Sequence, residues 1–540
     1  MNGPLRYLFA VLLAVAAATA SARMNVLVVM TDDQRADTLS KMPNLSDLAS
    51  RGVRFTNAFA PTPLCGPSRA SIYSGGFLEQ NTNVLSNEGA NGGAKAFNDK
   101  VNLGTVMQAA GYRTLFTGKW VNGYEGLGSY IPPGWTQFVG RHSFATITDW
   151  SSFRYTIGSS NQFSSGQGTI VGAQQYTAYY ERDKVLSFLQ SQKGSAKPFF
   201  IFWSPSAPHE RATPAPEDLN LFSDYTYRGR GYGETDLSDK PRWVRNNTSR
   251  DGTDDLVRRQ LRTLQSVDRS VATIVDKIRA IGELENTLIV FTSDNGYLWG
   301  EHGLWGKNKA YDESEGLPFV VLMPGVAPRV DGHLVSPMLD LGATLYELAG
   351  VTAKTDGRSL VSLLQNPRAQ WRSDFFVEST NNSVDGNALW AGVRNDQWKY
   401  VRYWTGEEEL YDLVNDPYEL ESRHNDPALA TLKAGFAART KQQLGLAIIP
   451  VPRFGAGKIG VPYKYQLKTW GGVGPFLWKI ATGALPPGLS LHAGTGMIDG
   501  TPSKAGTYQF SVRITDSVKA TQANKPRTFA TRLLTITVGL

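Results

Sequence analysis

The sequence predicts an α/β domain with a mostly parallel sheet flanked by helices, followed by an all-β domain. The first domain is predicted by short apolar runs that end in polar residues, with helical patterns lying between these runs. The second is predicted by a change in composition near residue 446, after which Gly, Pro, Thr and Val dominate. Buried strands that alternate with helices are typical of parallel sheets, and short strands separated by turns are typical of sandwiches.

The N-terminal residues have the pattern of a secretory signal peptide, predicted to span residues 1–22. Arg6 precedes an apolar run from Tyr7 to Ala18, and small residues follow up to Ala22. The run is shorter than the roughly 20 residues of a membrane span, although an uncleaved anchor is the alternative. No other stretch is long and apolar enough to cross a bilayer. We therefore expect a secreted or periplasmic protein with no membrane span after cleavage.

Three apolar runs predict strands buried on both faces. They cover Asn25 to Met30, Pro198 to Trp203 and Leu288 to Phe291, and each is followed by polar residues. Between the last two, Leu256 to Ile281 carries apolar residues at helical spacing. Ligands of parallel sheets gather at the carboxyl ends of the strands, so we expect a site there.

Composition and charge restrict the function further. The chain has 41% hydrophobic and 19% charged residues, as a folded globular protein does, and its net charge is +7. No long basic run concentrates this charge, which indicates weak attraction to anionic substrates and no nucleic-acid partner. Cys65 is the only cysteine. In an exported chain it cannot form an internal disulfide, so it is either a special thiol or a small buried apolar residue.

The C-terminal residues 446–540 are predicted to form a β-sandwich. Alternating segments such as Tyr463 to Leu467 and Tyr508 to Ile514 are separated by turn clusters. The segments Leu485 to Leu489 and Ile498 to Pro502 resemble the immunoglobulin-like modules appended to many secreted bacterial proteins. Both a spacer role and glycan binding are open for this domain.

The segment Cys65-Gly66-Pro67-Ser68-Arg69 resembles the signature of type I sulfatases. Further elements in the family's order extend this resemblance from about Asn25 to Asn425. The resemblance implies an alkaline-phosphatase-like domain over residues 23–445, with a small closing α+β subdomain at about 370–445. It also implies that a formylglycine-generating maturation enzyme converts Cys65 to formylglycine. Locally, Gly66 and Pro67 predict a turn that leads into a helix near Ser68.

Acidic and amide side chains follow the first and third predicted strands. Two successive Asp residues need a turn before both can face one site; alternatively, one caps a helix and the other is solvated. Asn295 precedes Gly296, which also fits a plain turn. Converging oxygen ligands suit Ca²⁺, or less well Mg²⁺, better than Zn²⁺. The family resemblance implies a Ca²⁺ site completed by position 65, with these ligands: Asp32, Asp33, Cys65, Asp294 and Asn295.

The resemblance also implies a set of catalytic residues, which are Cys65, Arg69, Lys119, His209 and Lys307. Lys119 and Lys307 would bind sulfate, with Lys309 as the alternative to Lys307, and His302 is interpreted as a loop residue. Arg69 would hold the hydrated aldehyde at position 65, Asp294 would take its proton, and His209 would protonate the leaving alcohol. One hydroxyl of the hydrate would attack sulfur, and the other would let the intermediate collapse to the aldehyde and release sulfate.

The substrate is predicted to be a sulfated carbohydrate. Gly118 to Tyr124 and Ile131 to Trp135 resemble the N-acetylglucosamine-6-sulfatase branch. Other positions depart from the family: Asp312 replaces a usual Glu, and Glu79 to Val84 lacks the usual histidines, which leaves the sugar end of the site undefined. The alternatives are a phosphonate or phosphate monoester hydrolase, and a non-catalytic sulfated-glycan-binding protein.

Overall fold

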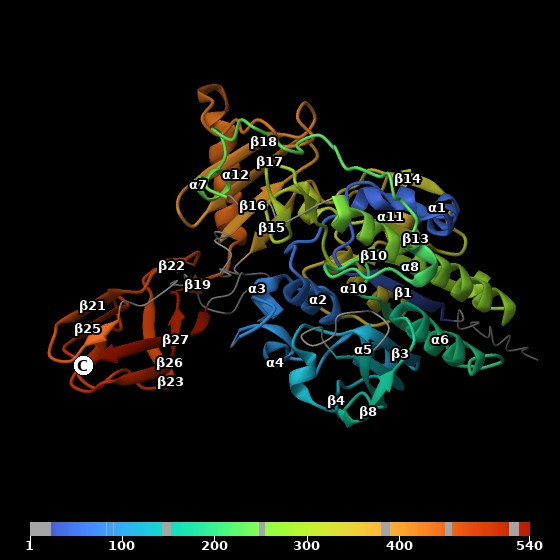
Figure 1. The fold of residues 1–540 in the computed structure, drawn as a ribbon, viewed down its shortest axis with the longest axis horizontal. Helices are drawn as coiled ribbons and strands as arrows, with labels where there is room; N and C mark the ends of the chain where they lie inside the picture. Colours follow the sequence, from blue (N-terminus) through green and yellow to red (C-terminus); the bar gives the residue numbers. More distant parts are fainter. Residues whose placement is uncertain are drawn as a thin grey trace, which may run out of the picture.

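The computed structural model describes residues 23–82, 84–89, 91–142, 153–247, 254–379, 389–448, 456–472, 474–517 and 529–540. The predicted signal peptide, residues 1–22, lies outside these described residues. Among the helices of the described residues, none is both long and apolar enough to span a membrane. Figure 1 shows a large α/β body, a smaller sheet with one helix beside it, and a β domain at the C-terminal end.

A ten-stranded sheet forms the centre of the α/β body. In spatial order its strands are β14 (Arg329–Asp331), β2 (Val53–Phe55), β13 (Phe319–Leu322), β10 (Thr287–Ser293), β1 (Asn25–Thr31), β9 (Phe199–Ser204), β3 (Arg113–Lys119), β5 (Gln137–Arg141), β6 (Phe153–Gly158) and β8 (Thr169–Ala173). The five strands from β10 to β5 are parallel, and antiparallel pairs lie on both sides of them. The predicted α/β fold with a mostly parallel sheet is therefore confirmed.

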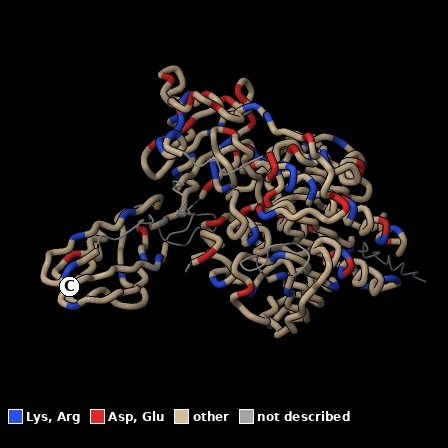
Figure 2. Tube along the Cα trace, in the orientation of Figure 1, with Lys and Arg blue, Asp and Glu red and all other residues tan. Residues whose placement is uncertain are grey.

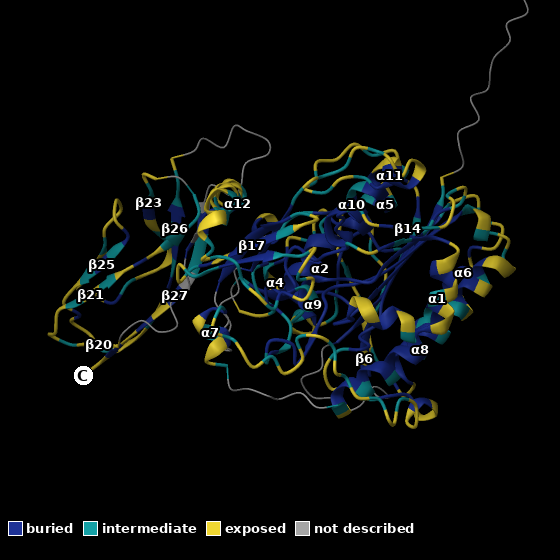
Figure 3. Ribbon diagram, turned by 90° about the horizontal axis from the view of Figure 1, so that it is seen from above, coloured by how far each residue is buried: buried dark blue, intermediate teal, exposed yellow. Residues whose placement is uncertain are grey.

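Helices cover both faces of this sheet, and alternate residues of β1 point into two separate cores. Val26 and Val28 pack in the core that includes α2 (Cys65–Tyr73), α5 (Leu103–Ala109) and α10 (Pro337–Leu348). Leu27 and Val29 pack in the core that includes α1 (Pro43–Ser50), α6 (Thr177–Gln190) and α8 (Asp254–Ala280). Figure 3 shows the buried strands between these layers. Burial on both faces explains the continuous apolar runs.

The register of the central strands determines where the polar residues emerge. β1 pairs with β10 from Asn25 opposite Thr287 to Thr31 opposite Ser293. The residues that follow the two strands, Asp32 and Asp294, therefore leave the sheet side by side at its carboxyl edge.

Two smaller units follow. The first is an antiparallel sheet of β15 (Phe375–Ser379), β16 (Trp390–Arg394), β17 (Trp398–Tyr403) and β18 (Glu408–Asp412) with α12 (Ala430–Gln443) beside it, which matches the predicted α+β subdomain. The C-terminal module has a four-stranded sheet, β20 (Gly457–Lys458), β27 (Phe529–Gly539), β26 (Gly506–Thr515) and β23 (Leu477–Gly483), and a three-stranded sheet, β21 (Tyr463–Gln466), β25 (Met497–Gly500) and β24 (Leu489–Leu491). Residues of both sheets pack in one apolar core, as in a sandwich.

The remaining helices and strands of the described residues are short. They are α3 (Glu79–Thr82), α4 (Gly93–Ala96), α7 (Arg242–Arg245), α9 (Asp312–Glu315), α11 (Val361–Gln365), β4 (Tyr130–Ile131), β7 (Gly166–Gln167), β11 (Leu298–Trp299), β12 (Trp305–Gly306), β19 (Ala447–Ile448), β22 (Thr469–Trp470) and the 3₁₀ turns Ala36–Lys41, Tyr124–Leu127, Pro216–Asp218, Leu284–Asn286 and Pro427–Leu429.

Candidate active site

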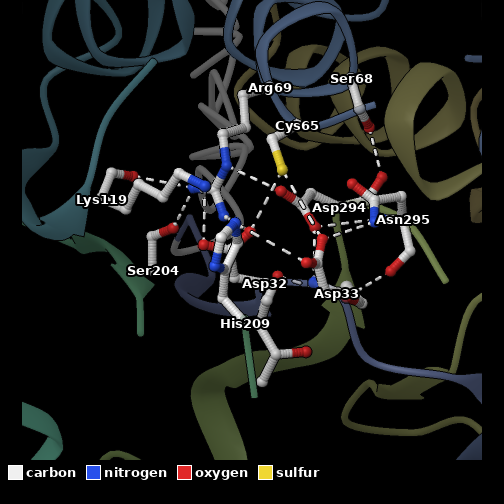
Figure 4. A network of polar contacts seen from close by, with 12 residues as sticks. Asp32, Asp33, Cys65, Ser68, Arg69, Lys119, Ser204, His209, Asp294 and Asn295 are labelled. Atoms are coloured by element: carbon white, nitrogen blue, oxygen red, sulfur yellow. Dashed lines mark hydrogen bonds and ion pairs between the residues drawn. The ribbon is translucent and has the colours of Figure 1, made fainter. Parts of the chain in front are cut away.

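Polar side chains from several segments meet beyond the carboxyl ends of the parallel strands (Figure 4). All residues predicted for the site lie in this one region, joined by hydrogen bonds and ion pairs: Asp32 and Asp33 after β1, Cys65 and Arg69 on α2, Lys119 at the end of β3, His209 after β9, Asp294 and Asn295 after β10, and Lys307 after β12. This is the edge of the sheet at which a ligand was expected.

The turn that two successive carboxylates need is present after β1. Asp33 has φ of 68°, in the left-handed region, where Asp is tolerated better than most residues. The Asp32 amide donates to the carbonyl of Ala207 at 3.2 Å, and the Asp33 amide donates to Asp294 Oδ1 at 3.0 Å. These bonds tie the turn to the segments after β9 and β10, so both carboxylates are buried in one site.

Cys65 is the first residue of α2, so the helix begins earlier than the predicted start near Ser68. Gly66 and Pro67 belong to the first helical turn, where proline is tolerated because the N–H that it lacks needs no helical partner. Ser68 therefore does not cap the helix; its hydroxyl donates to the Asp294 carbonyl at 2.5 Å. The helix end places the Cys65 side chain, fully buried, toward the two Asp carboxylates.

Arg69 lies one helical turn after Cys65 and links several strand ends. Its Nε donates to Asp294 Oδ2 at 2.8 Å, and its Nη1 donates to the hydroxyl of Ser204 at 2.7 Å and to the carbonyl of Lys119 at 2.9 Å. Its Nη2 lies 3.5 Å from Asp32 Oδ1. A fully buried guanidinium thus neutralises two carboxylates and fixes the ends of β3, β9 and β10 relative to one another.

Two lysines flank position 65. Lys307 Nζ lies 2.7 Å from Cys65 Sγ and 2.5 Å from Asp33 Oδ1, and Lys119 Nζ donates to Asp32 Oδ2 at 2.7 Å. Lys309, the alternative to Lys307, instead has its ammonium 5.7 Å from the ring centre of Trp243. His302 is buried, stacks on Tyr311 and hydrogen-bonds Glu234, so its side chain stabilises the loop by packing beneath it.

His209 is the most exposed of the predicted site residues, with 23% of its side chain accessible. Its Nε2 lies 3.7 Å from Asp33 Oδ2, and its Nδ1 is 3.0 Å from the carbonyl of Glu210. Burial and the nearby Lys307 lower the pKa of His209 to about 4. The imidazole is therefore neutral at pH 7, and a proton-donor role requires a bound anion that raises this pKa.

Burial and the nearby cations shift the pKa values of the remaining groups in opposite directions. Burial raises the pKa of the Cys65 thiol well above its usual range, and Lys119 and Lys307 offset this only in part. Burial also raises the pKa of Asp294, to about 6, against the effect of Arg69. For Asp32, Lys119 and Arg69 outweigh burial and hold the pKa well below its ordinary value. The unmodified thiol is therefore protonated at neutral pH and is a weak nucleophile.

The oxygen-rich side of the site fits a hard cation. Asp33 Oδ2 and Asn295 Oδ1 are buried and accept no hydrogen bond from the described residues. Donor atoms of Asp32, Asp33, Cys65 and His209 lie within 4.8 Å of one another. Carboxylate and amide oxygens are ligands of Ca²⁺ and Mg²⁺.

Asp294 is less available to a cation than its position after β10 predicts. Its Oδ1 accepts from the amides of Asp33 and Asn295, and its Oδ2 accepts from Arg69.

Sequence reasoning missed three polar residues that hold this site. The Ser204 hydroxyl accepts a hydrogen bond from Arg69, and the Asn87 side chain accepts one from the Gly66 backbone amide. The backbone N–H of Asn308, next to Lys307, donates a hydrogen bond to the carbonyl of Pro63. Ser204 stands at the end of an identified strand, which was the available signal for it; Asn87 and Asn308 lie in loops without such a signal.

In the stretch from Glu79 to Val84, which lacks the family's histidines, the described side chains other than the exposed Asn81 are buried. Glu79 accepts a hydrogen bond from the hydroxyl of Thr62 at 3.0 Å. Gln80 donates to the carbonyl of Gln443 at 2.9 Å and accepts from the Gly445 amide. These residues thus connect the region of the site to the end of α12.

Three family models match the chain. A sulfatase model matches residues 24–351, and a model described as "N-sulphoglucosamine sulphohydrolase, C-terminal" matches residues 300–444. A model described as "Putative Ig domain" matches residues 446–538.

Individual relatives are sulfatases. Human N-acetylglucosamine-6-sulfatase is 31% identical over 388 residues, 67% of this chain and 68% of that protein. The N-acetylglucosamine-6-O-sulfatase of Bacteroides thetaiotaomicron is 26% identical over 514 residues, 78% of this chain and 85% of that protein. The "Putative extracellular sulfatase Sulf-1 homolog" of Caenorhabditis elegans is 30% identical over 382 residues, and the matched region is 66% of this chain and about half (52%) of that protein.

Solved structures share the fold. A protein in complex with its substrate D-glucosamine-2-N,6-O-disulfate matches with a TM-score of 0.63 at 24% identity, over 78% of this chain and 97% of that chain. A phosphonate monoester hydrolase of Agrobacterium radiobacter matches with a TM-score of 0.61 at 21% identity, over 77% of this chain and 94% of that chain. The fold is therefore common to enzymes with different substrates.

Proposed function

The chain belongs to the sulfatase family, and from this premise we propose that it is a secreted or periplasmic enzyme that hydrolyses sulfate monoesters. The observation that carries the proposal is the pair of ammonium groups around position 65. Lys307 contacts Cys65 itself, and Lys119 contacts the carboxylate of Asp32, which lies 3.4 Å from Cys65. Such fixed cations stabilise the nonbridging oxygens of a sulfate ester as charge shifts in the transition state.

The contacts of each charged side chain in the site support a specific role in the proposed reaction. Lys119 and Lys307 bind the sulfate oxygens, and Arg69 keeps Asp294 beside position 65. His209, on the more exposed side, is placed to protonate the leaving alcohol once the substrate's negative charge raises its pKa. Asp294, with a pKa raised by burial to about 6, can accept a proton near neutral pH.

Two groups complete this proposal. A formylglycine, made from Cys65 by a maturation enzyme, supplies a hydrated aldehyde as the nucleophile, a role for which the protonated thiol is poorly suited. Ca²⁺ would be held by Asp32, Asp33, Asn295 and position 65, with Asp294 close by, and would supply positive charge for the sulfate oxygens.

The proposed substrate is 6-O-sulfated N-acetylglucosamine in a sulfated glycan. Support comes from the relatives named as N-acetylglucosamine-6-sulfatases. Further support comes from Gly118 to Tyr124, which resembles the same branch. Export is supported by the signal-like N-terminus and by a relative named as an extracellular sulfatase.

The test combines mass spectrometry with turnover. The peptide that contains Cys65 should carry the mass of the aldehyde, and the enzyme should release sulfate fastest from 6-sulfated N-acetylglucosamine in a panel of position-defined sulfated sugars. The Cys65→Ala variant should lose turnover while it keeps the fold. Full turnover by Cys65→Ala would refute the mechanism, and faster turnover of an aryl phosphonate than of any sulfate would favour the phosphonate hydrolase.

A further inference from the structure

The positive charge of the chain is concentrated in the C-terminal module, residues 446–540. These residues include eleven Lys and Arg but only two acidic residues, Asp499 and Asp516, a net charge of +9. The preceding residues 1–445 hold 44 Lys and Arg against 46 Asp and Glu, a net charge of −2. Figure 2 shows the contrast, with blue segments prevailing on the module and both signs mixed on the larger body. A net charge of this size creates a positive potential around a small domain.

Five lysines among the described residues of the module face solvent. These five lysines form no ion pair with any residue that the structure describes: Lys458, Lys464, Lys468, Lys479 and Lys504. The nearest acidic partner in the strand register is Asp499, opposite Lys464, and its carboxylate binds His492 at 2.8 Å. The lysine charges therefore remain available to an external anion.

The four-stranded sheet also places cations next to one another. Lys479 on β23 lies directly opposite Arg513 on β26. The residues that flank them along the strands, Trp478 and Val512, are buried, so Lys479 and Arg513 belong to the outer face of the sheet. An anionic group of a ligand bound on this face would therefore lie close to both cations.

We propose that the C-terminal module binds a sulfated polysaccharide and holds it near the active site of the same chain. The choice of a sulfated glycan among polyanions rests on the proposed function, because the enzyme's substrate would carry the same sulfate groups. Binding is expected to be electrostatic and therefore sensitive to salt. A polymer held by the module would return repeatedly to the active site, because tethering raises its effective concentration there.

The test compares two charge variants of the full-length protein on immobilised heparin. One variant changes Lys458, Lys464, Lys468, Lys479 and Lys504 to Gln. The matched control removes the same number of exposed lysines from the rest of the chain: Lys100, Lys193, Lys197, Lys354 and Lys441. We expect the module variant to elute at clearly lower salt and to bind heparin about tenfold more weakly or worse. The control should elute close to the parent protein.

Turnover separates this proposal from the proposed function. Both variants should hydrolyse a small aryl sulfate at the parent rate, whereas the module variant should need a higher concentration of polymeric substrate. Retention of heparin binding by the module variant, an equal loss in the control, or equally tight binding of the parent to DNA at the same salt would overturn the proposal. Lysine-dependent heparin binding without any sulfatase turnover would refute the proposed function alone.

Discussion

Asn308 has a left-handed backbone, with φ of 62°, and is only 4% exposed. Its backbone N–H donates to the carbonyl of Pro63, two residues before Cys65, at 2.8 Å. Its side-chain Oδ1 accepts from the hydroxyl of Ser379 at 2.6 Å. Lys307 is its neighbour in sequence. Asn308 therefore connects the loop of Lys307, the segment before the nucleophile position and the end of β15, so that it acts as a positioning residue.

Replacing this residue should reduce the catalytic rate more than the binding of substrate. In Asn308→Ala the backbone is strained and the bond from Ser379 is lost, so Lys307 moves relative to position 65. We expect kcat for an aryl sulfate to fall between about tenfold and a hundredfold, because small displacements of a positioned group are costly. Steady-state kinetics of the purified variant measure this.

Two further variants separate the causes. Asn308→Gly keeps the left-handed backbone and the backbone bond to Pro63 but removes the side-chain amide, and Ser379→Ala removes only the hydroxyl that donates to it. Both should lose less kcat than Asn308→Ala. Parent-like kcat in Asn308→Ala, or a loss that only follows the unfolding temperature, would contradict a positioning role.

Sequence reasoning identified the charged site residues better than the neutral residues that hold them. Cys65, Lys119 and His209 stand in short motifs of a family pattern, so their spacing along the chain is informative. The partners of Asn308 are Pro63 and Ser379, which are distant in sequence and become neighbours only in the folded chain. Such contacts leave no local signal.

At the scale of elements, the strand end that carries Lys119 depends on a glycine. Gly118 has φ of 106°, and a Cβ at this position would lie 2.1 Å from the carbonyl oxygen of Ser204 on the adjacent strand β9. Because this neighbour is backbone, it cannot rotate away. Only glycine lets β3 and β9 approach so closely while the chain turns Lys119 into the site.

The variant Gly118→Ala should destabilise the protein and disturb the site. Backbone strain alone costs about 1–3 kcal/mol, and the clash with Ser204 adds to it. The matched control is Gly172→Ala on β8 of the same sheet, where a Cβ would meet nothing within 4 Å; we expect a change within about 0.5 kcal/mol. Urea unfolding of the two variants measures both effects. Equal stability of the two would show that β3 can shift to admit the methyl group.

The contact between α6 and the sheet should make stability depend on pH. Glu181 on α6 is fully buried and accepts hydrogen bonds from Trp203 Nε1 at 3.0 Å and from the Tyr155 hydroxyl at 3.2 Å. Burial raises its pKa from an ordinary 4.5 to about 7. The folded protein therefore holds this proton more tightly than the unfolded chain does, so the contribution to stability is complete below about pH 4.5 and is lost as the pH rises to about 7.

Replacing the carboxyl by an uncharged amide should remove this dependence. Glu181→Gln keeps the shape and one acceptor, so we expect its free energy of unfolding to vary less between pH 4.5 and 7. The difference between the two proteins should change by an amount on the order of 3 kcal/mol over this range. Urea unfolding at several pH values provides the measurement. Parallel pH profiles for the parent and the variant would rule out titration of Glu181 in this range.

Length explains which elements were predictable. The runs that became β1, β9 and β10 are apolar throughout, because both faces of these strands are covered. The edge strand β14 and its neighbour β2 have only three residues each. At that length neither alternation nor composition distinguishes a strand from a loop, and their pairing with β13 and with each other depends on the rest of the sheet.

At the scale of the whole molecule, the subdomain of β15 to β18 is joined to the α/β body by buried charges. Lys399 on β17 is fully buried, and its ammonium lies 3.0 Å from Glu315, 2.8 Å from Glu419 and 3.0 Å from Asp312. Glu315 and Asp312 belong to α9, which follows the loop of Lys307. One lysine of the subdomain thus neutralises carboxylates that lie directly after a site loop.

The C-terminal module adjoins the same subdomain. Trp470 on β22 is half-buried against an apolar cluster that contains Phe376 of β15, Val393 of β16 and Leu444. The connection of body, subdomain and module therefore combines apolar packing on one side with the Lys399 network on the other.

Removal of the Lys399 charge should weaken the junction between the subdomain and the body. In Lys399→Met the apolar stem is retained, but three acidic groups lose their common cation. Removing one partner from a buried ionic network costs about 3–5 kcal/mol. Protonation relieves part of this cost, since burial already raises the pKa of Glu315 to about 7 and that of Glu419 to about 8. The variant should therefore be least stable at alkaline pH and recover below about pH 6.

Arg402→Met on the same strand is the control, because Arg402 is exposed and its loss should change stability by no more than about 0.5 kcal/mol. Thermal unfolding of both variants between pH 5.5 and 9, together with aryl sulfate turnover, tests the network. A Lys399→Met variant as stable as Arg402→Met at pH 9 would mean that the three carboxylates are satisfied without the lysine.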